Sequence, residues 1–144
     1  MIILSIDLGK TCGVSVWSTS QGVELTDEFK ADTLSGLHEK AKLLMDLWEP
    51  DLVLIPYPTR FYRVIMSHSK MMGVIELEAE KRDIQVIECQ DSTCKKVVIG
   101  SGRAKKPDIL KHYQDSGLTK EIGTESEHIL DSVMFIDWYN HETK

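Results

Sequence analysis

The sequence predicts one mixed α/β domain, and three observations support this prediction. The first thirty residues contain three runs typical of strands, separated by short polar turns. From about residue 34, helical patterns alternate with short apolar strands, which is the order typical of parallel strands joined by crossover helices. The 144 residues contain no repeat and no low-complexity linker, so they fit a single domain over residues 1–144.

The first two thirds of the chain predict a mixed five-stranded sheet flanked by helices. Strands are expected at residues 2–6, 13–18 and 22–29, as an antiparallel meander. Apolar residues at three- and four-residue steps then predict a helix over 34–48, which ends before Pro50. Two further buried strands are expected at residues 52–55 and 85–87, with a helix over about 63–81 between them.

The last third of the chain is predicted to be helical. A basic short helix and a glycine-rich turn are expected within residues 93–102, and Pro107 suits the first turn of another helix. The last helix has a start signal in Thr124-x-x-Glu127, which is a capping box. We expect its apolar side to face the sheet through Ile129, Leu130, Val133, Met134 and Ile136.

Composition narrows the class of protein. The three cysteines are odd in number and form no C-x-x-C pair, which argues against a disulfide framework and a zinc site. No signal peptide and no apolar run of about 20 residues is present, so the expected location is the cytoplasm. The net charge of −6 hides a basic stretch at residues 95–111 and a stretch at 121–142 without lysine or arginine. Each stretch is either a solvated face or a contact for phosphates or metal ions.

Three residues in these patterns are candidates for chemistry. Asp7 follows the apolar run Ile2–Ile6, where a carboxylate is either part of an ordinary strand-end turn with Gly9 or part of a site. His128 and Asp131 lie three residues apart and share one helix face. If the start of that helix approaches Asp7, the three side chains form a site suited to Mg²⁺ or Mn²⁺. Glu127 is interpreted as the acid of the capping box.

The order of these parts resembles the RuvC-type Holliday-junction resolvases of the RNase H-like nuclease superfamily. The matching stretches follow the family order over nearly the whole chain: SIDLG, EPDLVLI, MMGVI, CKKVVIGSGRAKKPDIL and HILDS. The resemblance implies an RNase H-like fold and a structure-selective DNA endonuclease. Such an enzyme acts in DNA recombination and repair by metal-dependent phosphodiester hydrolysis, and its substrates are four-way junctions and related branched DNA.

The resemblance also implies roles for individual residues. Asp7, His128 and Asp131 would be catalytic and would hold Mg²⁺ or Mn²⁺. Phosphate contacts would come from Lys95, Lys96, Arg103, Lys105 and Lys106. The residues after the fourth strand match an aromatic-bearing loop at the junction centre, where an aromatic side chain either wedges between bases or simply packs: Arg60, Phe61 and Tyr62.

A four-way junction has approximate two-fold symmetry, so symmetric incision predicts a homodimer. The helix over 63–81 is apolar on more than one face, which suits either a dimer interface or complete burial in the monomer. The expected setting is the cytoplasm of a bacterial cell or a phage-infected one, and the small size suggests a phage-borne member.

One position departs from the family. The family glutamate at the end of the fourth strand corresponds here to Pro56, which cannot bind a metal. Three explanations are open. Glu88, at the end of the next predicted strand, replaces the missing ligand; the site binds metal with three ligands; or the protein binds junctions without cutting them well. For Glu88 the other interpretation is a strand-end cap. Pre-ribosomal-RNA nucleases of the YqgF type similarly have a proline-containing turn after the fourth strand and an acid after the fifth.

A different class of protein is also suggested by the first turn. The stretch IDLGKT resembles the phosphate-binding turn of sugar kinases and actin-like ATPases. Those enzymes need two such domains around a nucleotide cleft, and 144 residues do not supply them.

Overall fold

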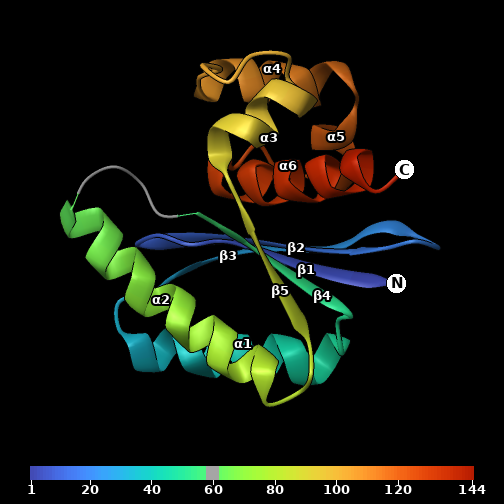
Figure 1. The fold of residues 1–144 in the computed structure, drawn as a ribbon. Helices are drawn as coiled ribbons and strands as arrows, with labels where there is room; N and C mark the ends of the chain where they lie inside the picture. Colours follow the sequence, from blue (N-terminus) through green and yellow to red (C-terminus); the bar gives the residue numbers. More distant parts are fainter. Residues whose placement is uncertain (58–61) are drawn as a thin grey trace.

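The computed structural model describes residues 1–57 and 62–144, with side chains from residue 66 onward in the second part. A five-stranded sheet with the strand order β3-β2-β1-β4-β5 lies at the centre (Figure 1). The antiparallel meander consists of β1 (Ile2–Asp7), β2 (Thr11–Ser18) and β3 (Gly22–Lys30). Parallel to β1 run β4 (Leu52–Pro56) and β5 (Gln85–Cys89). The predicted mixed sheet is therefore confirmed.

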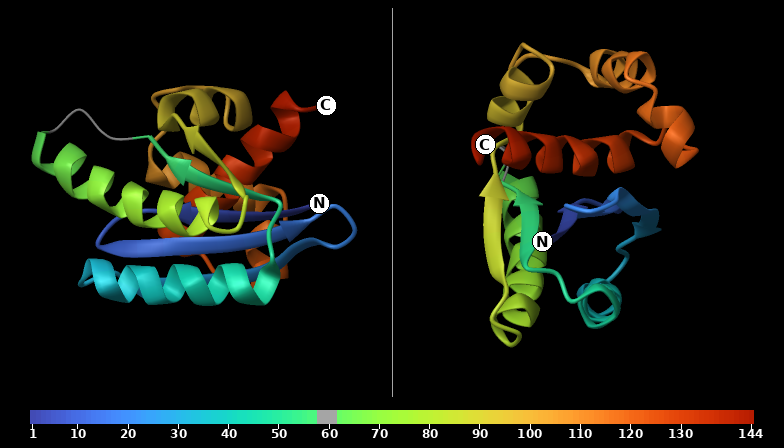
Figure 2. Two further views of the ribbon diagram at one scale, coloured as in Figure 1. Left: turned by 60° about the horizontal axis from the view of Figure 1, so that its bottom comes forward. Right: turned by 90° about the vertical axis from the view of Figure 1, so that its right-hand side faces the viewer.

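Helices cover both faces of this sheet (Figure 2). One face is covered by α1 (Leu34–Trp48) and α2 (Tyr62–Glu80). The other layer contains α3 (Asp91–Val98), α4 (Lys106–Asp115), α5 (Leu118–Ile122) and α6 (Glu127–Glu142). Because strand side chains alternate between faces, Leu4 and Ile6 belong to the core beneath α1 and α2, whereas Ile3 belongs to the core beneath α6.

The start of α6 lies unusually close to β2, and small residues make this approach possible. A Cβ atom at Gly13 would lie 1.9 Å from the carbonyl oxygen of His128, so only glycine fits there. Two residues further along β2, the Ser15 and Ser132 hydroxyls are 2.5 Å apart, and Ser132 Oγ also donates to the Ile129 carbonyl at 2.6 Å. Since Gly13 pairs with Asp7 across the sheet, this contact brings the first turn of α6 beside the end of β1.

The helical layer differs from the prediction in two places. The residue that caps α6 is Ser126, whose hydroxyl accepts from the Ile129 amide at 3.3 Å, so the predicted cap at Thr124 is wrong. Thr124 accepts instead from the Ser126 amide at 3.1 Å, and Ser126 donates to Glu28 of β3 at 2.6 Å. The short helix α5, which sequence patterns did not predict, is bounded by two glycines in the left-handed region, Gly117 and Gly123.

Most of the apolar surplus on α2 is used within the chain. Met71, Met72 and Ile75 are buried in the core shared with α1, whereas Met66 is 46% exposed and Leu77 52% exposed. The three cysteines are free and buried. None of the described helices combines the length and apolar character needed to cross a membrane.

Candidate active site

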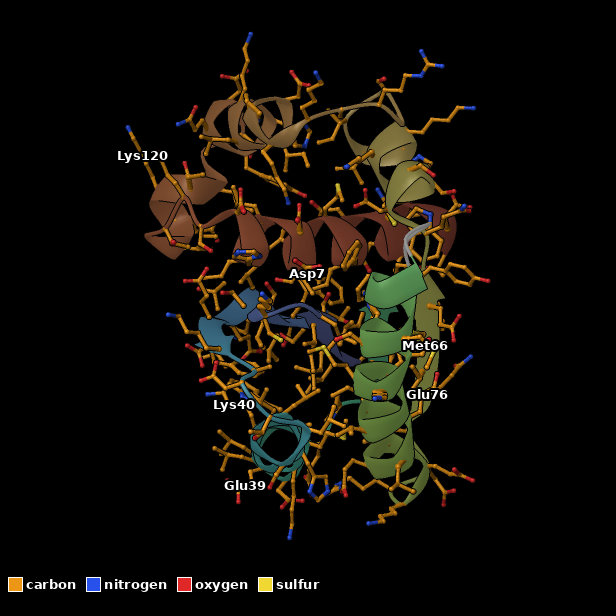
Figure 3. All side chains as sticks on the ribbon, turned by 90° about the vertical axis from the view of Figure 1, so that its left-hand side faces the viewer. Asp7, Glu39, Lys40, Met66, Glu76 and Lys120 are labelled. Atoms are coloured by element: carbon orange, nitrogen blue, oxygen red, sulfur yellow. The ribbon has the colours of Figure 1, made fainter. Side chains whose placement is uncertain are left out.

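The three chemical candidates meet where the carboxyl end of β1 reaches the first turn of α6. Asp7 is the last residue of β1 and shares the sheet face of Ile3, below α6 (Figure 3). His128 Nδ1 lies 3.7 Å from Asp7 Oδ2. Asp131 follows one turn later on α6, and its side chain is 8% exposed. The structure thus brings together residues that are far apart in the sequence.

A cleft of about 760 Å³ opens at this point and is lined by all three candidates. Its wall also contains three groups of chemical interest: His68 of α2, Asp91 at the start of α3, and Lys106 at the start of α4. The cleft is therefore built from three strands and four helices around the carboxyl end of β1 and β4, the usual position for a site in folds with parallel strands.

Burial and mutual repulsion disfavour the ionised form of the carboxylates in the cleft. Burial, and then the charge of Asp131, raise the pKa of the Asp7 carboxyl well above its usual value, against an opposing effect of Lys106. Burial also raises the pKa of Asp131, although its Oδ2 accepts a 2.5 Å hydrogen bond from Lys106 Nζ. Burial alone would lower the pKa of Lys106, but its bond to Asp131 produces a net rise. Lys106 therefore compensates only part of the local charge.

The donor chemistry of the cleft fits a divalent cation. Asp131 Oδ1 is buried and has no hydrogen-bond partner among the described residues, which leaves one carboxylate oxygen available for a ligand. Carboxylate oxygens with one imidazole are donors that Mg²⁺ and Mn²⁺ accept. Within the described part of the chain, no three His, Cys, Asp or Glu side chains are already close enough to share an ion. Ligation therefore requires these side chains to move closer together.

Register explains why Glu88 does not replace the family glutamate. Pro56 at the end of β4 lines the cleft, and its partner on β5 is Cys89, whereas Glu88 pairs with Ile55. Ile55 belongs to the core beneath α1 and α2, so Glu88 lies on the face opposite Asp7. Its carboxylate meets Glu76 of α2, and burial together with Glu88 raises the pKa of Glu76. The hypothesis of Glu88 as a substitute ligand is therefore wrong, and no backbone cap involves it among the described hydrogen bonds.

The acid that does reach the cleft after β5 is Asp91, which sequence reasoning missed. It is the first residue of α3, and its charge raises the pKa of both Asp7 and Asp131. Lys95 Nζ lies 2.6 Å from Asp91 Oδ2, so this carboxylate already has a cationic partner. Its position directly after a strand parallel to β4 is the signal that could have identified it.

The predicted phosphate contacts separate into two groups. Lys106 lines the cleft and pairs with Asp131, and Lys95 pairs with Asp91, which also lines the cleft. The other three are exposed and make no ion pair with any residue that the structure describes: Lys96, Arg103 and Lys105. The predicted aromatic loop lies outside the described residues at Arg60 and Phe61, and of Tyr62 only the backbone is described, as the start of α2.

Comparisons with known proteins agree with this geometry. The crossover junction endodeoxyribonuclease RuvC of Mycolicibacterium smegmatis is 32% identical over 125 residues, covering 77% of this chain and 68% of that protein. RuvC of Mycobacterium sp. strain KMS is 30% identical over 125 residues, which again cover 77% of this chain and 68% of that protein. No family model matches the sequence.

Solved structures show the same fold at low sequence identity. Thermus thermophilus RuvC has a TM-score of 0.76 at 16% identity, over 99% of this chain and 97% of that chain. The same protein in complex with Holliday junction substrate has a TM-score of 0.76 at 14% identity, over 99% and 96%. The fowlpox virus Holliday junction resolvase has a TM-score of 0.68 at 13% identity, over 99% of both chains.

Proposed function

Because the chain belongs to the RuvC family of crossover junction endodeoxyribonucleases, we propose that it cuts four-way DNA junctions by hydrolysing phosphodiester bonds with Mg²⁺ or Mn²⁺. The observation that carries the proposal is the meeting of Asp7, His128 and Asp131 in one cleft. A relative solved with a junction substrate shares the fold over almost the whole chain. The protein acts as one nuclease domain over residues 1–144.

The residues of the cleft have different roles in the proposed reaction. Asp7, Asp131 and His128 hold the divalent cation, which when bound supplies a more acidic water and positive charge near the phosphate. Asp91 and Asp7 add negative charge that repels a DNA phosphate while no cation is present. Lys106 pairs with Asp131, which opposes the rise that burial causes in the pKa of this carboxyl, and provides a cation in the lining of the cleft.

DNA binding uses the exposed cations beside the cleft. Lys96, Arg103 and Lys105 contact phosphates without reading sequence, so affinity depends strongly on salt. Arg60, Phe61 and Tyr62 contact the opened junction centre. Two copies of the chain bind one junction in the cytoplasm, because its approximate two-fold symmetry presents two equivalent cutting positions.

The test is cleavage of a synthetic four-way junction by the full chain, with Mg²⁺, with Mn²⁺ and with neither. The linear duplex of the same sequence is the matched substrate control. We expect paired incisions near the branch point that require the metal, and no cutting of the duplex. Equal cutting of junction and duplex would contradict the proposal.

Pro56 favours a second candidate, a protein that binds junctions with little cleavage. The proline lines the cleft at the position of the family glutamate, so one ligand of the family site is missing. Tight junction binding without incision in either metal would support this candidate. Cleavage of structured RNA in preference to the junction would instead indicate a pre-ribosomal-RNA nuclease of the YqgF type, which also has an acid after the fifth strand, as Asp91 is here.

A further inference from the structure

Unpaired polar atoms in the interior point to one further group in the cleft. Five buried side-chain atoms have no hydrogen-bond partner among the described residues: Ser5 Oγ, Trp48 Nε1, His68 Nε2, Asp131 Oδ1 and Trp138 Nε1. Indole nitrogens carry a hydrogen and cannot bind a cation, and a serine hydroxyl is a weak ligand. The two strong metal donors in this set, on His68 and Asp131, line the same cleft.

His68 lies beside the position that the family fills with glutamate. Its side chain is 7% exposed, and it comes from α2 one turn before the buried Met71 and Met72. The imidazole forms a hydrogen bond with the backbone of Pro56. Nε2 is buried and has no hydrogen-bond partner among the described residues, so this nitrogen is available to a ligand.

A buried imidazole nitrogen without a partner, on a ring that lies beside a backbone carbonyl, is compatible with the way metal-binding histidines are held. A ligating imidazole binds through one nitrogen and donates its other N–H to a carbonyl or carboxylate, which fixes the tautomer and the ring orientation. Burial lowers the pKa of His68, which favours the neutral form that ligation needs. An unpaired buried nitrogen without a ligand would otherwise be a net cost to the fold.

We propose that His68 binds the divalent cation of the cleft through Nε2 and thereby replaces the ligand that Pro56 removes. This inference rests on the proposed function. An imidazole would then stand where the family has a carboxylate, and the ligands would be Asp7, Asp131, His128 and His68. Imidazole suits Mn²⁺ better than Mg²⁺, which prefers oxygen donors, so we expect the protein to prefer Mn²⁺.

The experiment measures Mn²⁺ binding to the free protein by calorimetry and by the electron paramagnetic resonance signal of unbound Mn²⁺. His68→Leu should weaken binding at least about tenfold. It should change the melting temperature little, because the loss of the unpaired polar atom offsets the loss of the contact with the Pro56 backbone at similar side-chain volume. His68→Glu should restore binding and raise the ratio of Mg²⁺ to Mn²⁺ affinity. His141→Leu, at a histidine that is 64% exposed, is the matched control and should change neither quantity.

The outcomes separate this inference from the function on which it rests. If Asp7→Asn abolishes Mn²⁺ binding and His68→Leu does not, the metal site remains and the role of His68 is overturned. If neither change affects binding, the proposed metal site itself is wrong. A fall in melting temperature with unchanged Mn²⁺ affinity would make His68 a structural residue. If Asp91→Asn weakens binding and His68→Leu does not, Asp91 is the replacement ligand and the inference is wrong.

Discussion

Two buried carboxylates in this molecule, Glu78 and Asp7, have surroundings that shift their pKa values in opposite directions. Glu78 on α2 is 3% exposed and is surrounded by cations: it bonds to His38, and its oxygens lie 2.5 Å from Arg82 Nη1 and 3.2 Å from Lys81 Nζ. Hydrogen bonds from His38 and then Arg82 lower the pKa of Glu78 to about 2. Asp7 is also largely covered, but its pKa is raised by burial and by Asp131.

The difference distinguishes a carboxylate that stabilises the fold from one that we propose to bind a metal ion. At Glu78 the chain supplies its own countercharges, so the ionised form is stable without any ligand. In the cleft, Lys106 is the cation within bonding distance of Asp131, and the remaining charge favours binding of a cation from solution. A structural site therefore contributes to folding, whereas the cleft keeps a binding capacity at some expense in stability.

The largest expected effect is at Asp7. Asp7→Asn should lower junction cleavage about a thousandfold or more, since a metal centre stabilises the transition state by several kcal/mol. Junction binding should persist or tighten because one repulsive charge is removed. Cleavage assays and binding titrations on the same preparation measure both quantities. Full cleavage by the variant would remove Asp7 from the metal site.

A second change breaks the cleft by moving α6. Gly13→Ala puts a Cβ against the His128 carbonyl, so the helix must shift away from Asp7. We expect a loss of about 1–3 kcal/mol in unfolding free energy and at least tenfold slower cleavage. Gly73→Ala on α2 is the matched control because nothing lies within 4 Å of its Cβ position. That control should gain about 0.5–1 kcal/mol, and similar stabilities for both variants would contradict the role of Gly13.

Glu78→Gln tests the other side of the comparison. Removing the charge weakens the hydrogen bonds to His38 and Arg82, and a hydrogen bond to a charged group contributes about 1.5–3 kcal/mol. We expect urea unfolding to show a loss of about 2 kcal/mol at pH 7, with cleavage per folded molecule unchanged. A large loss of cleavage without a loss of stability would show that Glu78 has a functional role.

The two sites should respond to pH with opposite signs. Glu78 has a folded pKa of about 2, below its usual value of 4.5, so its stabilisation is present above pH 4.5 and is lost as the pH falls toward 2. Asp7 has a folded pKa above its usual 3.8, so its ionisation disfavours folding as the pH rises through that raised value. Thermal melts from about pH 2 to 8 should therefore show Glu78→Gln losing its defect in acid. Asp7→Asn should gain stability only above about pH 4.

The smallest expected effect comes from replacing the exposed cations, which differ from the paired cations around Glu78. Lys96, Arg103 and Lys105 are exposed and unpaired among the described residues, unlike Arg82 and Lys81. Changing the three to alanine should lower the slope of log affinity against log salt by about 0.9 for each phosphate that the protein no longer neutralises. An unchanged slope would mean that these residues form only a solvated face.

Local patterns predicted most of the fold, because period and chain direction are local properties. The meander, the parallel strands and the apolar side of α6 follow from such patterns. Local patterns did not predict features that depend on contacts between distant parts of the chain. Ser126 rather than Thr124 caps α6 because its hydroxyl also reaches β3, and no spacing rule contains that contact.

Site residues at the end of a strand or on a helix face could be predicted from the sequence. Residues whose sheet face depends on the strand register were harder to predict. Asp7 ends β1, and the family pattern placed His128 and Asp131 beside it. Glu88 failed because a shift of one residue along β5 changes the sheet face. His68 could have been noticed, since it is a polar residue on the buried face of Met71, Met72 and Ile75.

The close contact between β2 and α6 also determines at which point of its synthesis the chain can complete the proposed metal site. Ser15 and Ser132, which join the two elements, are 117 residues apart. A ribosome makes the strand with Asp7 first and the helix with His128 and Asp131 last. An incomplete chain therefore contains one half of the proposed metal site without the other. Products that end before α6 should lack the proposed nuclease activity, because the site is complete only when the last helix packs onto the second strand.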